Sequence, residues 1–114
     1  MNIYLIVNIK QDIIESGTIV LNNGFESIFS KKNVASMLLF ISARERVKER
    51  HLTEIVSNYY QSVDVAGTLV RAGLVRTWTE KIGHTIQWYE ITDLGRDVAG
   101  CLKNANELIG ATGQ

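Results

Sequence analysis

Two runs of β-branched and aromatic residues in the second half of the chain constrain its fold more than any other feature. The runs are Leu74–Thr79 and Thr85–Ile91, and the five residues between them include Gly83. Residues of these types favour extended strands, and a short connection that contains glycine is typical of a β-hairpin. Because the segments on either side are helical in pattern, the sequence predicts an α+β domain, mainly α, with one two-stranded hairpin.

The residues before the hairpin predict three helices. Asn33 is placed to cap the first, whose apolar residues recur at intervals of three and four. Val47 stands alone among charged residues and marks an exposed connection with a short extended stretch. A short second helix is predicted over Leu52–Asn58, and Ser62 is placed to cap a third helix that Gly73 ends. Three helices are therefore expected in about 40 residues.

A fourth helix is expected directly after the hairpin. Thr92 is placed to cap it, and its pattern continues to about Leu108. One side of this helix carries Leu94, Val98, Cys101, Leu102, Ala105 and Leu108. Because this apolar stripe is longer than one small helical core needs, we expect it to form the interface of a homodimer.

The first 32 residues are ambiguous. Alternating apolar residues over Ile3–Ile9 fit a strand, whereas a second set from Ile3 to Ile14 fits a helical stripe that Gly17 ends. Thr18–Leu21 suggests a short strand that runs into a turn at Asn22–Gly24. We therefore divide the chain into an N-terminal extension at 1–32 that can complete a dimer interface, a folded domain at 33–110 and a frayed tail at 111–114.

Composition narrows the class of protein. At 114 residues with 46% hydrophobic residues, the chain is the size of one globular domain. The longest apolar run, Val34–Ile41, is far shorter than the roughly 20 residues that span a bilayer. Its start has no secretory signal pattern, and Cys101 is the single cysteine. We expect a cytoplasmic protein without a membrane span or an intrachain disulfide.

The sequence contains no recognisable catalytic or metal-binding pattern. His51 and His84 are isolated from each other and from any cysteine at ligand spacing. There is no glycine-rich phosphate loop and no Ser, His and Asp set in a familiar context. We therefore expect no enzymatic activity, no metal and no cofactor.

The order of the predicted elements resembles a known family. A helix, a short helix and a helix precede a hairpin that Gly73-Leu74-Val75 enters, and Ile91–Arg96 opens the last helix. This resembles the small bacterial and archaeal winged-helix transcriptional regulators of the MarR, ArsR and PadR type, over Asn33–Leu108. The resemblance implies a winged helix-turn-helix with a three-helix core, a two-stranded wing and a C-terminal helix. Its third helix is then the recognition helix for the major groove.

The charge distribution is compatible with a nucleic-acid partner. The formal net charge is zero, but residues 31–84 carry nine bases against five acids, between acidic flanks. The candidate DNA-contacting residues are Arg44, Arg46 and Lys48 before the second helix, Tyr60, Gln61 and Ser62 at the turn, Thr68 and Arg71 on the third helix, and Arg76, Lys81 and His84 on the hairpin. Asp64, on the expected outward side of the third helix, opposes phosphate binding.

Two functions follow from this sequence. The first is sequence-specific binding of double-stranded DNA by a homodimeric transcriptional regulator, with Thr68 and Arg71 nearest the bases. The alternative is a winged-helix module for protein assembly that binds no DNA, since fold does not fix function. The bases of Arg44–Arg50 alternate with acids and equally fit a solvated face. Salt-dependent binding to duplex DNA separates the two functions.

Overall fold

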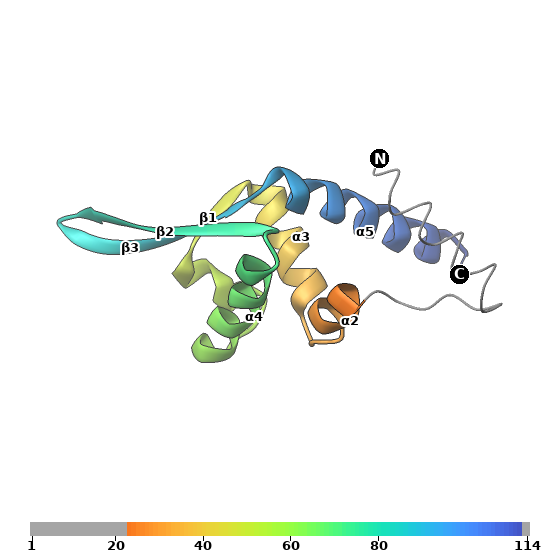
Figure 1. Ribbon diagram of the computed structural model, residues 1–114, viewed down its shortest axis with the longest axis horizontal. Coiled ribbons are helices and arrows are strands. Elements are labelled where there is room, and N and C mark those ends of the chain that lie inside the picture. Colours follow the sequence, from red (N-terminus) through yellow and green to blue (C-terminus); the bar gives the residue numbers. More distant parts are fainter. Residues whose placement is uncertain (1–22, 113–114) are drawn as a thin grey trace.

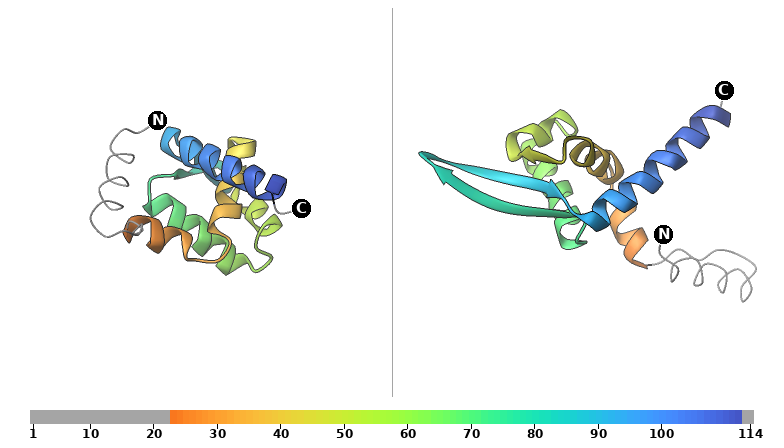
Figure 2. Two further views of the ribbon diagram at one scale, coloured as in Figure 1. Left: turned by 90° about the vertical axis from the view of Figure 1, so that its right-hand side faces the viewer. Right: turned by 90° about the horizontal axis from the view of Figure 1, so that it is seen from above.

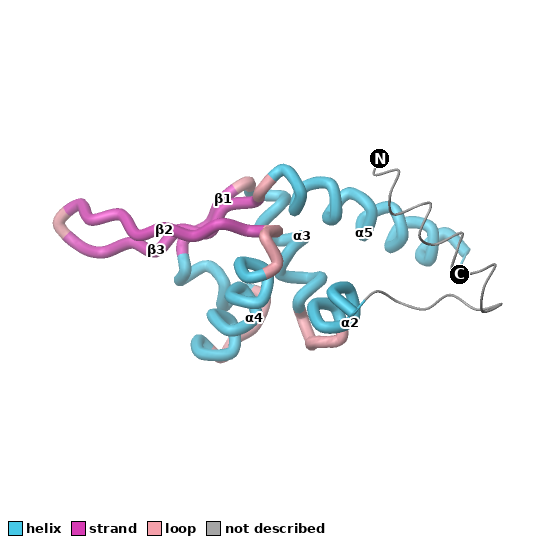
Figure 3. Tube along the Cα trace, viewed as in Figure 1, coloured by secondary structure: helices cyan, strands magenta, loops and turns pink. Residues whose placement is uncertain are grey.

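The computed structural model describes residues 23–112, and these form a helical body with a long β-hairpin (Figures 1 and 3). In chain order the elements are α2 (Asn23–Phe29), α3 (Val34–Arg44), β1 (Arg46–Lys48), the 3₁₀ helix η1 (Glu49–Glu54), α4 (Tyr59–Arg71), β2 (Val75–Ile82), β3 (His84–Ile91) and α5 (Asp93–Thr112). The expected order of helices, hairpin and final helix is confirmed. The hairpin and α5 project from the body in opposite directions (Figures 1 and 2).

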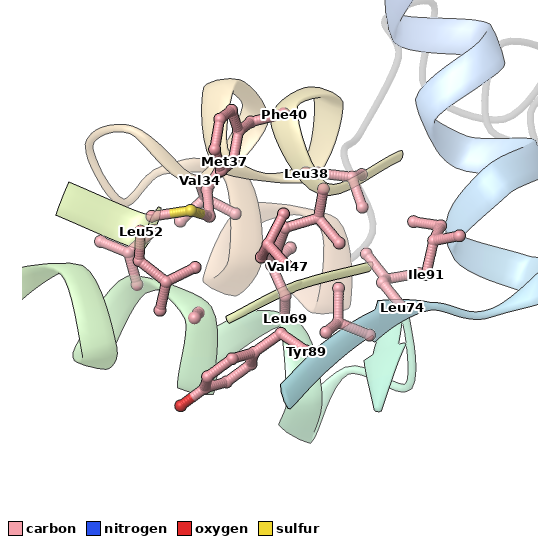
Figure 4. Packing of buried hydrophobic residues seen from close by; sticks show 14 of the residues in the cluster. Val34, Met37, Leu38, Phe40, Val47, Leu52, Leu69, Leu74, Tyr89 and Ile91 are labelled. Carbon is pink, nitrogen blue, oxygen red and sulfur yellow. The ribbon is translucent and has the colours of Figure 1, made fainter. Parts of the chain in front are cut away.

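Helix α3 lies at the centre of the hydrophobic core (Figure 4). Five of its eleven residues are buried, and they are Val34, Met37, Leu38, Phe40 and Ile41. Residues of η1, α4 and the sheet surround them, among them Leu52, Leu69 and Tyr89. Asn33 occupies the predicted cap position, but its side chain makes no capping bond, and its backbone turns into the helix with a φ of 71°. The burial pattern, rather than the cap, therefore accounts for this helix.

The second helix differs from the prediction in type and position. It is the 3₁₀ helix η1 at Glu49–Glu54 rather than an α-helix over Leu52–Asn58. The Thr53 hydroxyl donates to the Arg50 carbonyl at 2.9 Å, and the Ile55 amide donates to the Leu52 carbonyl at 3.1 Å, a spacing that tightens the turn. Asn58 instead caps α4, since its side-chain oxygen accepts from the Gln61 amide at 3.0 Å. A good capping residue thus begins the next helix rather than ending this one.

The three strands form an antiparallel sheet in the order β1-β3-β2. Strands β2 and β3 pair along their whole length from Val75↔Ile91 to Ile82↔His84, and Gly83 makes the turn with a φ of 71°. The short β1 pairs Val47 with Tyr89. The predicted hairpin and the predicted extended stretch at Val47 are both confirmed, but the expected five-residue connection at 80–84 is a turn at Gly83 alone, because strand pairing continues to Ile82↔His84.

Helix α5 begins where the sequence predicts and ends later. The Thr92 hydroxyl accepts from the Gly95 amide at 3.0 Å and donates to the Gly73 carbonyl at 2.7 Å, which confirms Thr92 as the cap. Arg96 then pairs with Glu45 at 2.7 Å and ties α5 to the end of α3. The helix continues to Thr112, beyond the expected end near Leu108. Fraying of the tail therefore stays a prediction.

The predictions for residues 1–32 can be compared with the structure only from Asn23 onward. The strand or helix at 3–17 and the strand at 18–21 lie outside the described residues. The turn expected at Asn22–Gly24 is wrong for its second half, because α2 begins at Asn23. Phe25 and Phe29 of this helix lie with ring centroids 4.9 Å apart, and Phe29 packs against the core.

Candidate nucleic-acid interface

Helix α4 presents one side to the core and the other to solvent. Val65, Ala66 and Leu69 are buried against α3 and η1, as the sequence predicts. Tyr60, the most exposed of its large side chains at 81%, and Arg71 lie on the exposed side. The four turns of this helix are therefore anchored along one side and accessible along the other, as a recognition helix requires.

Two predicted contact residues on α4, Ser62 and Thr68, are buried, so their prediction as surface contacts is wrong. Ser62 is 0% exposed and its hydroxyl donates to the Tyr59 carbonyl at 2.6 Å. It lies inside the helix because α4 begins at Tyr59 rather than at Ser62. Thr68 is 8% exposed and its hydroxyl donates to the Asp64 carbonyl at 3.2 Å. A position three residues after the buried Val65 shares its side of the helix, so this spacing already indicated burial.

A polar network extends along the edge of α4. Lys31, from the segment between α2 and α3, places its Nζ 2.7 Å from Oδ2 of Asp64 and donates to Oγ1 of Thr68 at 3.1 Å. Arg71 donates from Nη2 to the same Thr68 oxygen at 3.3 Å. The bond from Lys31 holds the pKa of Asp64 below its usual value. Lys31 was not among the predicted site residues, because nothing local links it to a helix some thirty residues later.

The hairpin has two faces of different character, and the register assigns residues to each. The helix-side face carries Val75, Thr77, Thr79 and Lys81 on β2 with Thr85, Gln87, Tyr89 and Ile91 on β3. The outer face carries Arg76, Trp78, Glu80 and Ile82 with His84, Ile86, Trp88 and Glu90. Val75, Tyr89 and Ile91 are buried against the body, which identifies the helix-side face as the one toward α4. Predicted wing residues are thereby divided between opposite faces.

Most of the predicted bases near β1 and β2 lie on the outer face and contact aromatic rings. Arg46 and Lys48 lie 4.9 and 5.6 Å from the ring centroid of Trp88. Arg76 pairs with Glu90 and lies 5.3 Å from the Trp78 ring centroid.

The aromatic residues beneath these bases pack within the sheet. Trp78 and Trp88 are cross-strand partners with stacked rings 6.2 Å apart. Arg44, on α3, lies 4.2 Å from the Phe40 ring centroid and 3.8 Å from Glu54. The structure thus brings Arg46, Lys48 and Arg76 together on the face turned away from α4.

Threonine and glutamine side chains line the exposed part of the helix-side face. Gln87 donates to the Thr77 hydroxyl at 2.6 Å and accepts from the Thr79 hydroxyl at 2.6 Å. Lys81 extends from the same face at the exposed tip, with His84 on the other side of Gly83. Within residues 23–112 Lys81 forms no ion pair. Gln87 was not predicted as a site residue, although the alternation of the strand places it on the same face as Lys81.

A shallow groove connects the exposed side of α4 to the helix-side face. It is lined by Tyr60, Val63, Asp64, Gly67, Val70 and Arg71 from α4 and by Thr77 and Tyr89 from the hairpin. Helix α4 and the hairpin therefore present one continuous surface. The predicted contacts that contribute to this side are Tyr60, Gln61, Arg71 and, at the hairpin tip, Lys81, whereas the register places His84 at the tip on the outer face.

The carboxylate of Glu49 links the hairpin, η1 and α4. Glu49 accepts from the hydroxyl of Tyr59 at the start of α4 and from that of Tyr89 on β3, the latter at 2.9 Å. The ring of Tyr89 packs in the core and its hydroxyl points out of it (Figure 4). Burial, followed by the bond to Glu49, raises the pKa of Tyr89 above its usual value. This three-residue contact spans forty positions, and no local pattern indicates it.

The predicted dimer residues of helix α5 differ in how far they are buried. Val98 and Leu102 are half-buried against the core. Leu94 is 54% exposed, and Cys101 and Ala105 are exposed as well. Leu108, near the end of the helix, is 68% exposed. Part of the apolar stripe therefore completes the domain core, which explains some of its length.

Neither a metal centre nor a membrane span is found in the part of the chain that the structure describes. No cluster of three or more potential ligands among His, Cys, Asp and Glu side chains occurs in residues 23–112. No helix of these residues has the length and apolarity to cross a bilayer.

Solved structures share this architecture. No protein-family model matches the chain, and no curated protein matches it. The chain is similar to a transcriptional regulator homologue from Pyrococcus horikoshii, with a TM-score of 0.64 and 18% identity over 91% of this chain and 96% of that one. It has the winged helix-turn-helix fold. A mutant MepR from a multidrug resistant S. aureus clinical isolate is also similar, with a TM-score of 0.61 and 11% identity over 96% of this chain and 78% of that chain.

Proposed function

We propose that this winged-helix protein is a transcriptional regulator that binds duplex DNA as a homodimer. The observation that carries the proposal is the continuous surface formed by the exposed side of α4 and the helix-side face of the hairpin. A helix in the major groove reads base edges, while a hairpin beside it contacts the neighbouring backbone. The similarity to solved regulators supports this use of the fold.

The proposed contacts differ from those expected from sequence. Arg71, Tyr60 and Gln61 on α4 approach the bases and the adjacent phosphates, and Lys81 and His84 approach phosphates from the hairpin tip. Ser62 and Thr68 are not among the proposed contacts, because their side chains are buried. Arg44, Arg46, Lys48 and Arg76 are assigned to packing on aromatic rings, and Arg46 and Lys48 thereby join β1 to Trp88 of the hairpin.

The homodimer rests on the exposed apolar side of α5. Leu94, Cys101 and Ala105 are exposed although they belong to the apolar stripe of the helix, and a symmetric partner helix covers such a surface. Ala105→Glu is the sharper test, because Leu102 also contacts the core. We expect sedimentation to show a dimer for the wild type and a folded monomer for this variant. A monomeric wild type at micromolar concentration contradicts the dimer.

DNA binding is tested by titrating a pool of duplexes with the full chain at two salt concentrations. We expect affinity to fall steeply with salt, because phosphate contacts release counterions. Lys81→Ala should weaken binding about equally for all sequences and reduce the salt slope by about 1. Lys103→Ala, an exposed lysine on α5, is the matched control and should change neither quantity.

Sequence preference gives a second readout. Arg71→Ala should relax specificity at one position, at a cost of about 1 to 3 kcal/mol if its contact to a guanine is bidentate. The selected site should be nearly palindromic, with half-sites about one helical turn apart. A folded dimer without salt-dependent binding to any duplex would instead identify a protein-assembly module.

A further inference from the structure

An acidic residue occupies the exposed side of α4, where a carboxylate alone would repel the DNA backbone. Asp64 lies one turn after Tyr60 and lines the groove toward the hairpin. Phosphate charge supplies most of the affinity in protein–DNA complexes, so an isolated carboxylate at this position opposes binding to every sequence. A DNA-binding helix with Asp64 at this position therefore needs an interaction that offsets the negative charge of the carboxylate.

The compensating interaction is the pair with Lys31. Its Nζ lies 2.7 Å from Oδ2 of Asp64 and 3.1 Å from Oγ1 of Thr68, so the ammonium group is held at two points. Both charged side chains are substantially exposed, and ion pairs of this kind contribute little to folding stability. The main effect of Lys31 is therefore on the helix surface, where it cancels the charge of Asp64 and fixes the orientation of its carboxylate.

The second carboxylate oxygen is left as an acceptor. Oδ1 of Asp64 forms no hydrogen bond with any residue between 23 and 112. In the major groove, cytosine presents an N4 amino group as a donor, whereas guanine N7 and O6 and thymine O4 are acceptors that repel a carboxylate. Adenine also has an amino group, but its adjacent N7 is an acceptor. A fixed carboxylate oxygen therefore distinguishes cytosine from the other bases.

Arg71 places a donor close to this acceptor. Its guanidinium lies over Gly67, with Nη1 3.2 Å from the position that a Cβ there would occupy. Glycine is unfavourable inside a helix, but at position 67 it leaves room for the guanidinium beside the turn that follows Asp64. Asp64 and Arg71 are two turns apart, and the guanidinium reaches back to Gly67, so a cytosine-reading acceptor and a guanine-reading donor lie on the same exposed helix side.

We propose that Asp64 determines specificity for cytosine in each half-site, and that Lys31 is a positioning residue that orients its carboxylate and offsets its charge. This inference rests on the proposed DNA-binding function. It adds a base contact and a residue from outside the helix-turn-helix segment. Asp64, whose charge opposes phosphate binding, then contributes selectivity for one base.

The first experiment selects sites from a pool of randomised duplexes with the full-length protein. We expect the wild type to enrich cytosine at one position per half-site by about tenfold or more over the other bases. Asp64→Ala should lose that preference while binding unselected duplexes more tightly. Asp64→Asn should shift it toward adenine, because an amide pairs with N6 and N7 of that base. An unchanged cytosine preference in both variants overturns the proposal.

The second experiment tests Lys31 with a readout that does not depend on DNA. In nuclear magnetic resonance titrations, Lys31→Met should raise the pKa of Asp64, whereas Lys31→Arg should keep it low. Lys32→Met is the matched control, since Lys32 is exposed and forms no ion pair within residues 23–112. Lys31→Met should also weaken DNA binding less in an Asp64→Asn background than in the wild type. Equal losses in the two backgrounds, or an unmoved pKa, overturn the positioning role.

The outcomes separate this inference from the function on which it rests. If neither the wild type nor any variant enriches a duplex, the proposed DNA-binding function is wrong. If the wild type enriches a site whose cytosine preference survives both Asp64 substitutions, DNA binding stands and the specificity assignment is wrong. Circular dichroism of each variant verifies that it is folded before selection.

Discussion

Replacement of Gly95 by alanine provides the sharpest test of how α5 joins the domain. A Cβ at this position would lie 1.9 Å from the carbonyl oxygen of Leu74 and 2.7 Å from Cδ1 of Ile91. Both neighbours belong to the base of the hairpin, and the Leu74 oxygen is a backbone atom that no side-chain rotation moves. The start of α5 and the start of β2 therefore meet at a distance that only glycine allows.

The cost follows from what must move. Ordinary contact begins near 3.4 Å, so the helix start must retreat by about 1.5 Å. Two bonds made by Thr92 tie that start to the hairpin base, from its amide to the Leu74 carbonyl at 3.1 Å and from its hydroxyl to the Gly73 carbonyl at 2.7 Å. Each such bond contributes about 1 kcal/mol net, and overpacking itself costs about 1 to 3 kcal/mol. We expect Gly95→Ala to lower the free energy of unfolding by about 3 to 5 kcal/mol.

The assay is urea and thermal unfolding at one fixed protein concentration, because the proposed dimer would make the unfolding midpoint depend on concentration. A loss of this size lowers the melting temperature by roughly 10 °C or more in a domain of this length. Gly100→Ala in the same helix is the matched control, because nothing lies within 4 Å of its Cβ position. That change should stabilise the protein by about 0.5 to 1 kcal/mol, through helix propensity alone. Equal unfolding midpoints for the two variants would refute the reasoning.

Three further predictions concern the core, the hairpin and pH. Leu52→Ala, at a fully buried side chain, should lower the free energy of unfolding by about 2 to 5 kcal/mol in urea titrations, and a loss below 1 kcal/mol would contradict its place in the core. Arg76→Ala should reduce DNA affinity less than Lys81→Ala, because Arg76 is paired with Glu90 on the outer face; the reverse order in a binding titration would contradict the division of faces. Because the folded-state pKa of Tyr89 is raised, its contribution to stability is complete below the usual value of 10.0 and is lost as pH rises from that value through the raised folded-state pKa. Tyr89→Phe should therefore flatten the fall in stability on the alkaline side, and an unchanged slope would contradict the raised pKa.

Local patterns determined which secondary structures form in much of this protein. The β-branched and aromatic runs specified both strands of the hairpin, and Val47 marked the third strand. Thr92 specified the start of α5, because a capping hydroxyl acts within three residues of itself. These features depend on neighbours in sequence, so the sequence alone was sufficient to predict them.

Element boundaries within the helix-turn-helix were decided by competition between neighbouring signals. Both Asn58 and Ser62 are good capping residues, and only the packed structure shows that Asn58 begins α4. The choice shifts the helix start by four residues and buries Ser62. The 3₁₀ form of η1 follows from the same short connection, since Leu52 must reach the core within a few residues of β1.

The candidate site depended most on tertiary structure. The strand register, fixed by burial of Tyr89 beside Val47, places Arg76 on the outer face and leaves Lys81 on the helix side. The partners of Asp64 and Tyr89 are Lys31 and Glu49, which lie about thirty and forty positions away in the chain. Charge and periodicity carry no information about such distant partners, because they are set only when the helices and the sheet pack around one core. The sequence therefore determined most of the helices and strands and the excess of basic residues at 31–84. Packing decided which of these basic side chains lie on the same surface as the exposed side of α4.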